Sequence, residues 1–172
     1  MSNALPAPSG NVSWITQASL ERTVSASRTS ARKRMIQPFH RTDQASLQRM
    51  FNAVQLGSYI APHRHLDPPK DESWIVLRGA LAFFTFDEQG NIEECLEVGA
   101  GQDVFGVDLE AGVYHSFFAL VPDTVVYEVK TGPYAPSTDK AFAPWAPREG
   151  DPGVTAYLEH LQAEFQRRVK AT

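Results

Sequence analysis

The sequence predicts a mainly β protein, built as a sandwich or small barrel. About six short segments rich in Val, Phe, Tyr and Ile alternate with stretches of Pro, Gly and Asp. The chain has 12 prolines and 11 glycines in 172 residues, which indicates frequent turns. Short strands separated by turns are typical of antiparallel β architectures. A chain of this length forms one domain with a sizeable core.

The expected strands begin near residue 54. They cover residues 54–65, 72–86, 92–98, 102–109, 113–120 and 124–130. Turn-forming runs such as Asp67-Pro68-Pro69 and Gly99-Ala100-Gly101 separate them. Residues 132–153 are too rich in Pro and Gly for a regular element, and we expect them to wrap along the surface.

Helices are expected on both sides of the strands. Thr16 can cap a helix that runs to about residue 27, and Asp43 can cap a second over residues 44–52. Residues 154–170 have the apolar spacing of an amphipathic helix. The expected organisation is a flexible tail (1–12), an N-terminal helical segment packed on the barrel (13–53), the barrel (54–150) and a C-terminal helix (151–172).

Composition argues against several classes of protein. The formal net charge is -4, whereas nucleic-acid binding needs a basic surface. No run approaches the roughly 18 apolar residues of a membrane span, and residues 1–11 lack the pattern of a signal peptide. Cys95 is the single cysteine, so no intramolecular disulfide can form. We therefore expect a cytoplasmic protein without nucleic-acid or membrane partners.

The placement of the histidines predicts a metal centre. His63 and His65 are two residues apart on an expected strand, so both side chains point to one face. Glu72 begins the next strand, and His115 lies on a later one. Three imidazoles and one carboxylate suit a first-row divalent metal such as Zn, Fe, Ni, Mn or Cu. The alternative is that these histidines are packed or surface residues; His40 is not expected to be a ligand.

Two motifs resemble those of the cupins, small β-barrels that hold a metal with three histidines and a glutamate. The first, G-x5-H-x-H-x6-E-x6-G, runs from Gly57 to Gly79, and the second is EAGVYH at residues 110–115. The gap between His65 and Glu72 is longer than is usual in cupins, and Glu110 replaces the usual proline. If Glu72 is not a ligand, it becomes the best candidate for a general base.

Longer runs between residues 14 and 149 resemble the cupin-fold metalloproteins of the WbuC family. They are RKRMIQPFH, LQRMFNAVQLGSYIAPHRH, DESWIVLRGAL, EVKTGPYAP and FAPWAP. The resemblance implies a cupin-type β-barrel or jelly roll with one divalent transition metal: Zn, Fe, Ni or Mn. The family name comes from bacterial surface-polysaccharide gene clusters, which implies a link to polysaccharide biosynthesis. The resemblance, with an unpaired outer sheet face, also favours a homodimer.

The side chains expected around the metal form a small-molecule site. Residues that share a strand face with the ligands are mostly apolar or aromatic. Arginines near the barrel mouth can hold a carboxylate or phosphate. The expected substrate contacts are Tyr59, Arg34, Arg49, Asn52, Trp74, Phe117 and Tyr134. Core packing and surface ion pairs are the alternatives for these side chains, and Arg64 is expected to point away from the metal.

Three functions are compatible with such a site. The first is a metal-dependent isomerase or epimerase that acts on a sugar or small polar metabolite. A ferrous-iron dioxygenase is the rival enzyme, because this ligand set serves that chemistry in other cupins. The third is a non-catalytic, metal-dependent module that binds a saccharide or organic acid. The sequence assigns no catalytic residue and leaves open whether the protein is an enzyme.

Overall fold

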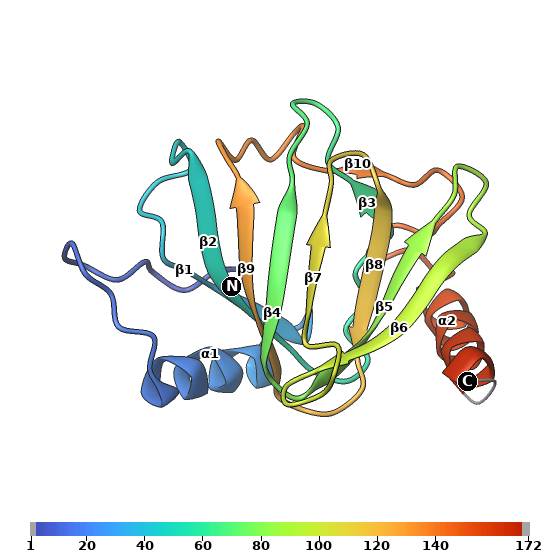
Figure 1. Cartoon of the computed structure of the whole chain (residues 1–172), viewed down its shortest axis with the longest axis horizontal. Helices are drawn as coiled ribbons and strands as arrows, with labels where there is room; N and C mark the ends of the chain where they lie inside the picture. The colour runs from blue at the N-terminus through green and yellow to red at the C-terminus, as the bar shows by residue number, and fades with distance from the viewer. Residues whose placement is uncertain (1–2, 170–172) are drawn as a thin grey trace.

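The computed structural model describes residues 3–169 as two antiparallel β-sheets with a helix at each end (Figure 1). The first sheet has five strands in the order β1-β2-β9-β4-β7, and the second has five in the order β10-β3-β8-β5-β6. The two sheets pack face to face around an apolar core. The predicted fold class, mainly β with terminal helical elements, is confirmed.

The strands of the two sheets are short and come from both halves of the chain. The first sheet contains β1 (Arg34–Pro38), β2 (Leu47–Val54), β9 (Thr124–Thr131), β4 (Glu72–Arg78) and β7 (Gly106–Leu109). The second contains β10 (Ala141–Phe142), β3 (His63–Arg64), β8 (Tyr114–Ala119), β5 (Ala80–Phe86) and β6 (Ile92–Gly99). Within each sheet, every pair of neighbouring strands is antiparallel, as the turn-rich sequence predicts.

The chain changes sheet at Gly79, between β4 and β5. This residue has φ +73°, and a Cβ there would lie 2.5 Å from Oγ1 of Thr124. A side chain is therefore excluded both by the backbone conformation and by the space. The glycine lets β4 and β5 follow each other directly while they belong to opposite sheets.

The interior between the sheets is apolar at one end and polar at the other. Along the paired strands β4 and β9, Val76 faces Val126, whereas four residue pairs further Glu72 faces Lys130. Val76 and Val126 belong to the main core cluster, together with Phe83 and Phe117. Functional side chains are thus concentrated at the polar end, where the apolar core stops.

Each helix covers the outer face of one sheet. The first, α1 (Gln17–Thr29), begins at Thr16 as predicted and packs Leu20 and Val24 against Phe51 of the first sheet. The second, α2 (Val154–Val169), lays Leu161 and Phe165 on the second sheet. The expected C-terminal helix is therefore confirmed within the described residues; Lys170 lies outside them.

The second N-terminal helix expected over residues 44–52 is wrong, because Leu47–Val54 is the strand β2. From Met50 to Val54 every residue of this strand is buried. Its inner face meets the core between the sheets, and its outer face, with Phe51 and Ala53, lies under α1. Burial on both faces removes the alternation that marks a strand, so the spacing of Leu47, Met50 and Phe51 resembled a helix.

The barrel also begins earlier than expected. The strand β1 starts at Arg34, so residues 34–54 belong to the first sheet rather than to a helical segment. Residues of the expected tail lie along this strand, since the N–H of Leu5 donates to the carbonyl of Ile36 at 2.8 Å. Residues 1–2 lie outside the described part of the chain.

The long strand expected over residues 54–65 is also wrong, because residues 55–62 are not extended in a sheet. Side chains donate to some of their backbone carbonyls instead. The guanidinium of Arg34 donates to the carbonyl of Tyr59 at 2.8 Å, and Ser116 Oγ donates to that of Ile60 at 2.6 Å. Strand alternation therefore does not extend from His63 back to Tyr59.

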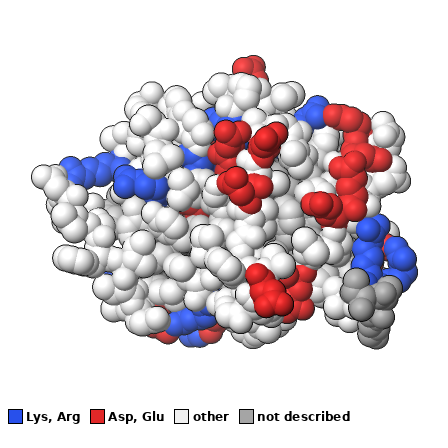
Figure 2. Space-filling model, viewed as in Figure 1, with Lys and Arg blue, Asp and Glu red and all other residues white. Residues whose placement is uncertain are grey.

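Acidic side chains gather in patches on the face shown in Figure 2, which is consistent with the formal net charge of -4. One of these patches lies on the side of the molecule where Figure 1 shows β5 and β6. Within residues 3–169, no helix is both long and apolar enough to cross a membrane.

Candidate metal centre

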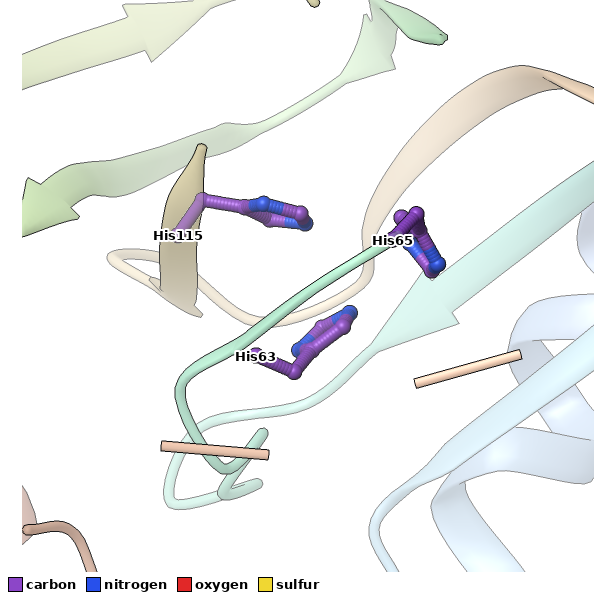
Figure 3. A group of neighbouring side chains, drawn as sticks. All are labelled: His63, His65 and His115. Carbon is purple, nitrogen blue, oxygen red and sulfur yellow. The ribbon is translucent and has the colours of Figure 1, made fainter. Parts of the chain in front are cut away.

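Strand pairing brings three histidines together at the polar end of the interior. His63 on β3 is the direct cross-strand partner of His115 on β8, and His65 follows β3 immediately. One ring nitrogen of each lies within 4.8 Å of the other two, and all three side chains are buried. Figure 3 shows the three rings turned toward a common space. This is the arrangement expected of three ligands to one ion.

Backbone carbonyls fix the tautomer of each ring. Nδ1 of His63 lies 2.9 Å from the carbonyl of Ala61, and Nδ1 of His115 lies 2.9 Å from that of Val113. Nδ1 of His65 contacts the carbonyl of Asp139. A carbonyl only accepts hydrogen bonds, so each Nδ1 carries the proton and each Nε2 presents a lone pair. Metal-binding histidines are commonly oriented in this way.

The fourth group, Glu72, lies against two of the rings. Its Oε2 is 3.0 Å from Nε2 of His65 and 3.5 Å from Nε2 of His115. Its Oε1 accepts a hydrogen bond from Nε1 of Trp74 at 2.7 Å. Nδ1 of His65 holds the proton of the neutral ring, so Nε2 of His65 and Oε2 of Glu72 are both acceptors. They would face each other at 3.0 Å unless a second proton or a cation lies between them.

Two further features fit a metal ion. Nε2 of His115 is buried and has no hydrogen-bond partner among residues 3–169. Burial raises the pKa of Glu72, but its contacts with His115 and His65 outweigh burial and hold that pKa well below its ordinary value. Burial and the charge of Lys140 lower the pKa of His63 well below its ordinary value. An ionised carboxylate and a neutral imidazole are the forms that bind a divalent cation.

A second layer of charged groups lies next to the histidines. Glu128 and Lys130 share the inner face of β9 with Val126, and both are buried. Burial and the Glu72 carboxylate raise the pKa of Glu128 to about 8. Nζ of Lys130 lies 3.0 Å from Oδ2 of Asp139, whose Oδ1 lies 2.8 Å from Nζ of Lys70. The carboxylate of Asp139 thus forms ion pairs with two buried ammonium groups.

Sequence reasoning missed Glu128, Asp139 and Lys140. A usable signal existed for Glu128, because Val126, Glu128 and Lys130 alternate on one strand. Once Val126 is placed in the core, the two charged residues must also face inward. Asp139 and Lys140 lie in the irregular segment after β9, where no periodicity indicates their direction.

A cavity of about 600 Å³ lies beside the metal centre, a size typical of small-molecule sites, about 300–1000 Å³. Ala61 and Phe142, which both contact His63, form part of its wall. Polar side chains from the inner face of the first sheet line the opposite part of the cavity wall. The polar residues that line the cavity include Asn52, Glu128, Lys130, Asp139 and Lys140.

The structure separates the expected substrate contacts into three groups. Arg34, Asn52 and Tyr134 line the cavity. Trp74 and Phe117 pack against each other in the interior with ring centroids 4.7 Å apart, and Trp74 also contacts His115.

Two expected contacts lie elsewhere. The hydroxyl of Tyr59 donates to the carbonyl of Pro147 at 2.7 Å, and its ring packs on Tyr157 of α2. Arg49 is exposed and lines a separate shallow groove beside Phe39 and Tyr127. Neither residue is among those that line the cavity. Arg64 points away from the centre, as expected, and lies over the ring of Tyr114 at 4.2 Å.

Comparison with known proteins gives distant matches. Residues 15–98 match a family model described as a domain of unknown function, DUF6016. No curated protein matches the chain. KdgF from Halomonas sp. is similar in structure, with 20% identity over 60% of this chain and 80% of that chain and a TM-score of 0.44.

Two more solved structures are similar at the same level. A mutant of Bacillus subtilis oxalate decarboxylase OxdC is 20% identical over 56% of this chain and 24% of that chain, with a TM-score of 0.46. The conserved SPY1581 protein of unknown function from Streptococcus pyogenes is 18% identical over 62% of this chain and 80% of that chain, also with a TM-score of 0.46. At this distance, function has to be inferred from the side chains of this chain.

Proposed function

We propose that this protein is a metal-binding cupin in which His63, His65, His115 and Glu72 hold one divalent transition metal. The observation that supports this most strongly is the protonation pattern of the rings. All three Nδ1 atoms contact backbone carbonyls, while the buried Nε2 of His115 has no partner among the described residues. Nitrogen and oxygen donors together suit Zn, Fe, Ni or Mn.

The activity we propose is that of a metal-dependent isomerase or epimerase for a sugar or small polar metabolite. A bound metal would supply Lewis-acid stabilisation of negative charge on a substrate oxygen. Glu128 is the cavity-lining carboxyl best placed to move a proton, because it lies on the strand next to Glu72. The other buried carboxyl of the cavity, Asp139, is occupied by Lys70 and Lys130. The relation to the WbuC family, the link to polysaccharide biosynthesis and the homodimer are parts of this proposal.

Elemental analysis of protein purified without a metal-affinity tag tests the metal centre. We expect about one equivalent of one transition metal in the native chain. His63→Ala should reduce the content to near zero, whereas His160→Ala, which removes an exposed histidine of α2, should leave it unchanged. Equal metal content in all three proteins, or none in the native chain after reconstitution, would contradict the proposal.

Solvent exchange tests the reaction. An isomerase or epimerase removes a carbon-bound proton, so sugars incubated with the metal-loaded protein in D₂O should acquire deuterium. Glu128→Gln should abolish this exchange while the metal content stays at the native level. Saturable binding without exchange would identify a non-catalytic binding module instead. Iron in the native protein together with substrate-dependent oxygen consumption would identify a dioxygenase.

A further inference from the structure

The cavity contains one lysine without a direct partner. Lys140 lines the cavity, and it makes no ion pair or hydrogen bond within residues 3–169. It precedes β10, whose Phe142 pairs directly with His63. The free ammonium therefore lies on the side of the cavity that borders the metal centre.

The other cationic groups of the cavity are occupied. Lys130 pairs with Asp139. Arg32 and Arg34 both bind the carboxylate of Glu149, at 2.7 Å and 2.6 Å. The guanidinium of Arg148 lies over the ring of Phe142, 3.6 Å from its centroid. Lys140 is thus the one cavity-lining lysine or arginine in the described chain that makes no ion pair, hydrogen bond or ring contact.

A second unpartnered group lies in the same cavity. Asn52 is only 8% exposed, and its Oδ1 is buried without a hydrogen-bond partner. It faces Val126 across β2 and β9, at the level where the polar end of the interior meets the apolar core. Buried amide oxygens in proteins nearly always accept a hydrogen bond. A ligand that fills the cavity has to bring the missing donor.

We infer that the cavity binds a small monocarboxylate that carries hydroxyl groups. Its carboxylate pairs with Nζ of Lys140, and one hydroxyl donates to Oδ1 of Asn52. The carbon skeleton lies on Ile60, Ala61 and Phe142, which supply apolar wall. One unpaired ammonium balances one carboxylate, whereas a phosphate dianion would need the arginines that Glu149 already holds. Only one part of this inference rests on the proposed function, namely that the bound acid is the substrate of the metal centre.

Calorimetric titration of the protein as purified tests this. The probes are D-gluconate and the shorter D-glycerate, each matched to the neutral polyol, D-glucitol or glycerol, and to hexanoate, which has a carboxylate but no hydroxyl. We expect at least one hydroxy acid to bind about tenfold or more tightly than its matched polyol and than hexanoate, because hydrogen bonds to charged groups contribute that much. Failure of both hydroxy acids to bind at millimolar concentration, or tighter binding of glucose 6-phosphate, overturns the inference.

Two variants assign the contacts separately. Lys140→Met should remove the preference for the acid over its polyol, and Asn52→Leu should remove the preference for the hydroxy acid over hexanoate. Arg167→Gln removes an equal charge from the exposed face of α2 and should change neither preference. If Lys140→Met keeps the native preference for the acid over its polyol, the inference is overturned even if the protein binds gluconate.

The same titration with chelator-treated protein separates this inference from the metal proposal. Hydroxy-acid binding that persists without metal supports the anion site even if the metal centre fails its own test. About one equivalent of metal without any hydroxy-acid binding would leave the metal proposal standing and reject the anion site. Metal content should remain native in both Lys140→Met and Asn52→Leu, because neither side chain is among the proposed ligands.

Discussion

The two sheets contribute different chemistry to the same interior. The second sheet brings His63 and His115 into register on β3 and β8, with their Nδ1 atoms bound to backbone carbonyls. The first sheet brings ionic and amide groups: Glu72 on β4, Glu128 and Lys130 on β9, and Asn52 on β2. His63 and His115 are satisfied by carbonyls of residues close in sequence, whereas His65 and the ionic groups depend on the distant loop that contains Asp139.

This difference separates metal binding from ligand recognition. Imidazoles held by their own strand keep one geometry when the cavity changes. In the first sheet, Lys130 is paired with Asp139, which lies outside that sheet and also binds Lys70. We therefore expect substitutions of the histidines to remove metal, and substitutions in the first sheet, apart from those of Glu72, to change stability or ligand preference.

The largest effect on stability should come from the buried ion pairs of Asp139. Asp139→Asn leaves the ammonium groups of Lys70 and Lys130 buried without their counter-ion, which should cost about 3–5 kcal/mol in the free energy of unfolding. Urea denaturation measures this as a lower midpoint. Glu21→Gln, which removes an exposed carboxylate paired with Arg78, is the control and should shift the midpoint little. A small effect of Asp139→Asn would mean that the first sheet does not depend on its charges.

The same carboxylate predicts a pH dependence. Burial raises the pKa of Asp139, but Lys130 and the hydrogen bonds from both lysines outweigh it and hold that pKa below its ordinary value. A carboxylate with a lowered folded-state pKa stabilises the protein above its unfolded-state pKa, about 3.9. The stabilisation should therefore be complete near neutral pH and decline as the pH falls below about 4. Asp139→Asn should lack this part of the acid sensitivity.

The outer faces of the two sheets can be compared by one matched truncation. Leu161→Ala in α2 and Leu20→Ala in α1 each truncate a buried leucine. Each should lower the free energy of unfolding by about 2–5 kcal/mol. Leu161 lies in the larger apolar cluster, with Phe84, Phe118 and Phe165, so its truncation should cost more. Thermal or urea unfolding of the pair measures the difference. Equal costs would show that the helices cover the sheets equally well.

Glu72→Gln measures how much the first sheet contributes to the metal centre. The amide oxygen can still accept the hydrogen bond from Trp74, but the negative charge beside His65 and His115 is lost. We expect metal affinity to fall about 10–100-fold, with full occupancy recovered in excess metal. Competition with a chromophoric chelator measures the change. Unchanged affinity would show that Glu72 is not a ligand and restore its role as a candidate base.

The smallest effect should come from the start of α1. Thr16 caps the helix by accepting from the N–H of Ser19 at 3.2 Å, and Ser19 Oγ accepts from the N–H of Thr16 at 3.1 Å. Thr16→Ala should cost about 1 kcal/mol in stability. Because α1 covers only the outer face of the first sheet, metal content should stay native. Loss of metal in this variant would contradict the separation of the outer cover from the interior site.

Local sequence patterns were enough for the fold class, both terminal helices and the shared direction of His63 and His65. His63 and His65 point to one face because alternate residues of an extended chain do so, and this holds without any knowledge of neighbouring strands. Thr16 and the apolar spacing after residue 154 act within single helices. In each case the forces that decide the structure act between residues close in sequence.

Tertiary structure alone decided the features that depend on more than one segment. Residues 47–54 form a strand because α1 and the core bury both faces, which hides the alternation that a single exposed face would show. Tyr59 turns toward α2 because side chains replace strand partners for its backbone. Asn52 and Lys140 meet in one cavity although 87 residues separate them by number. Burial and charge pairing depend on the whole packed chain, so no local pattern could place these groups together.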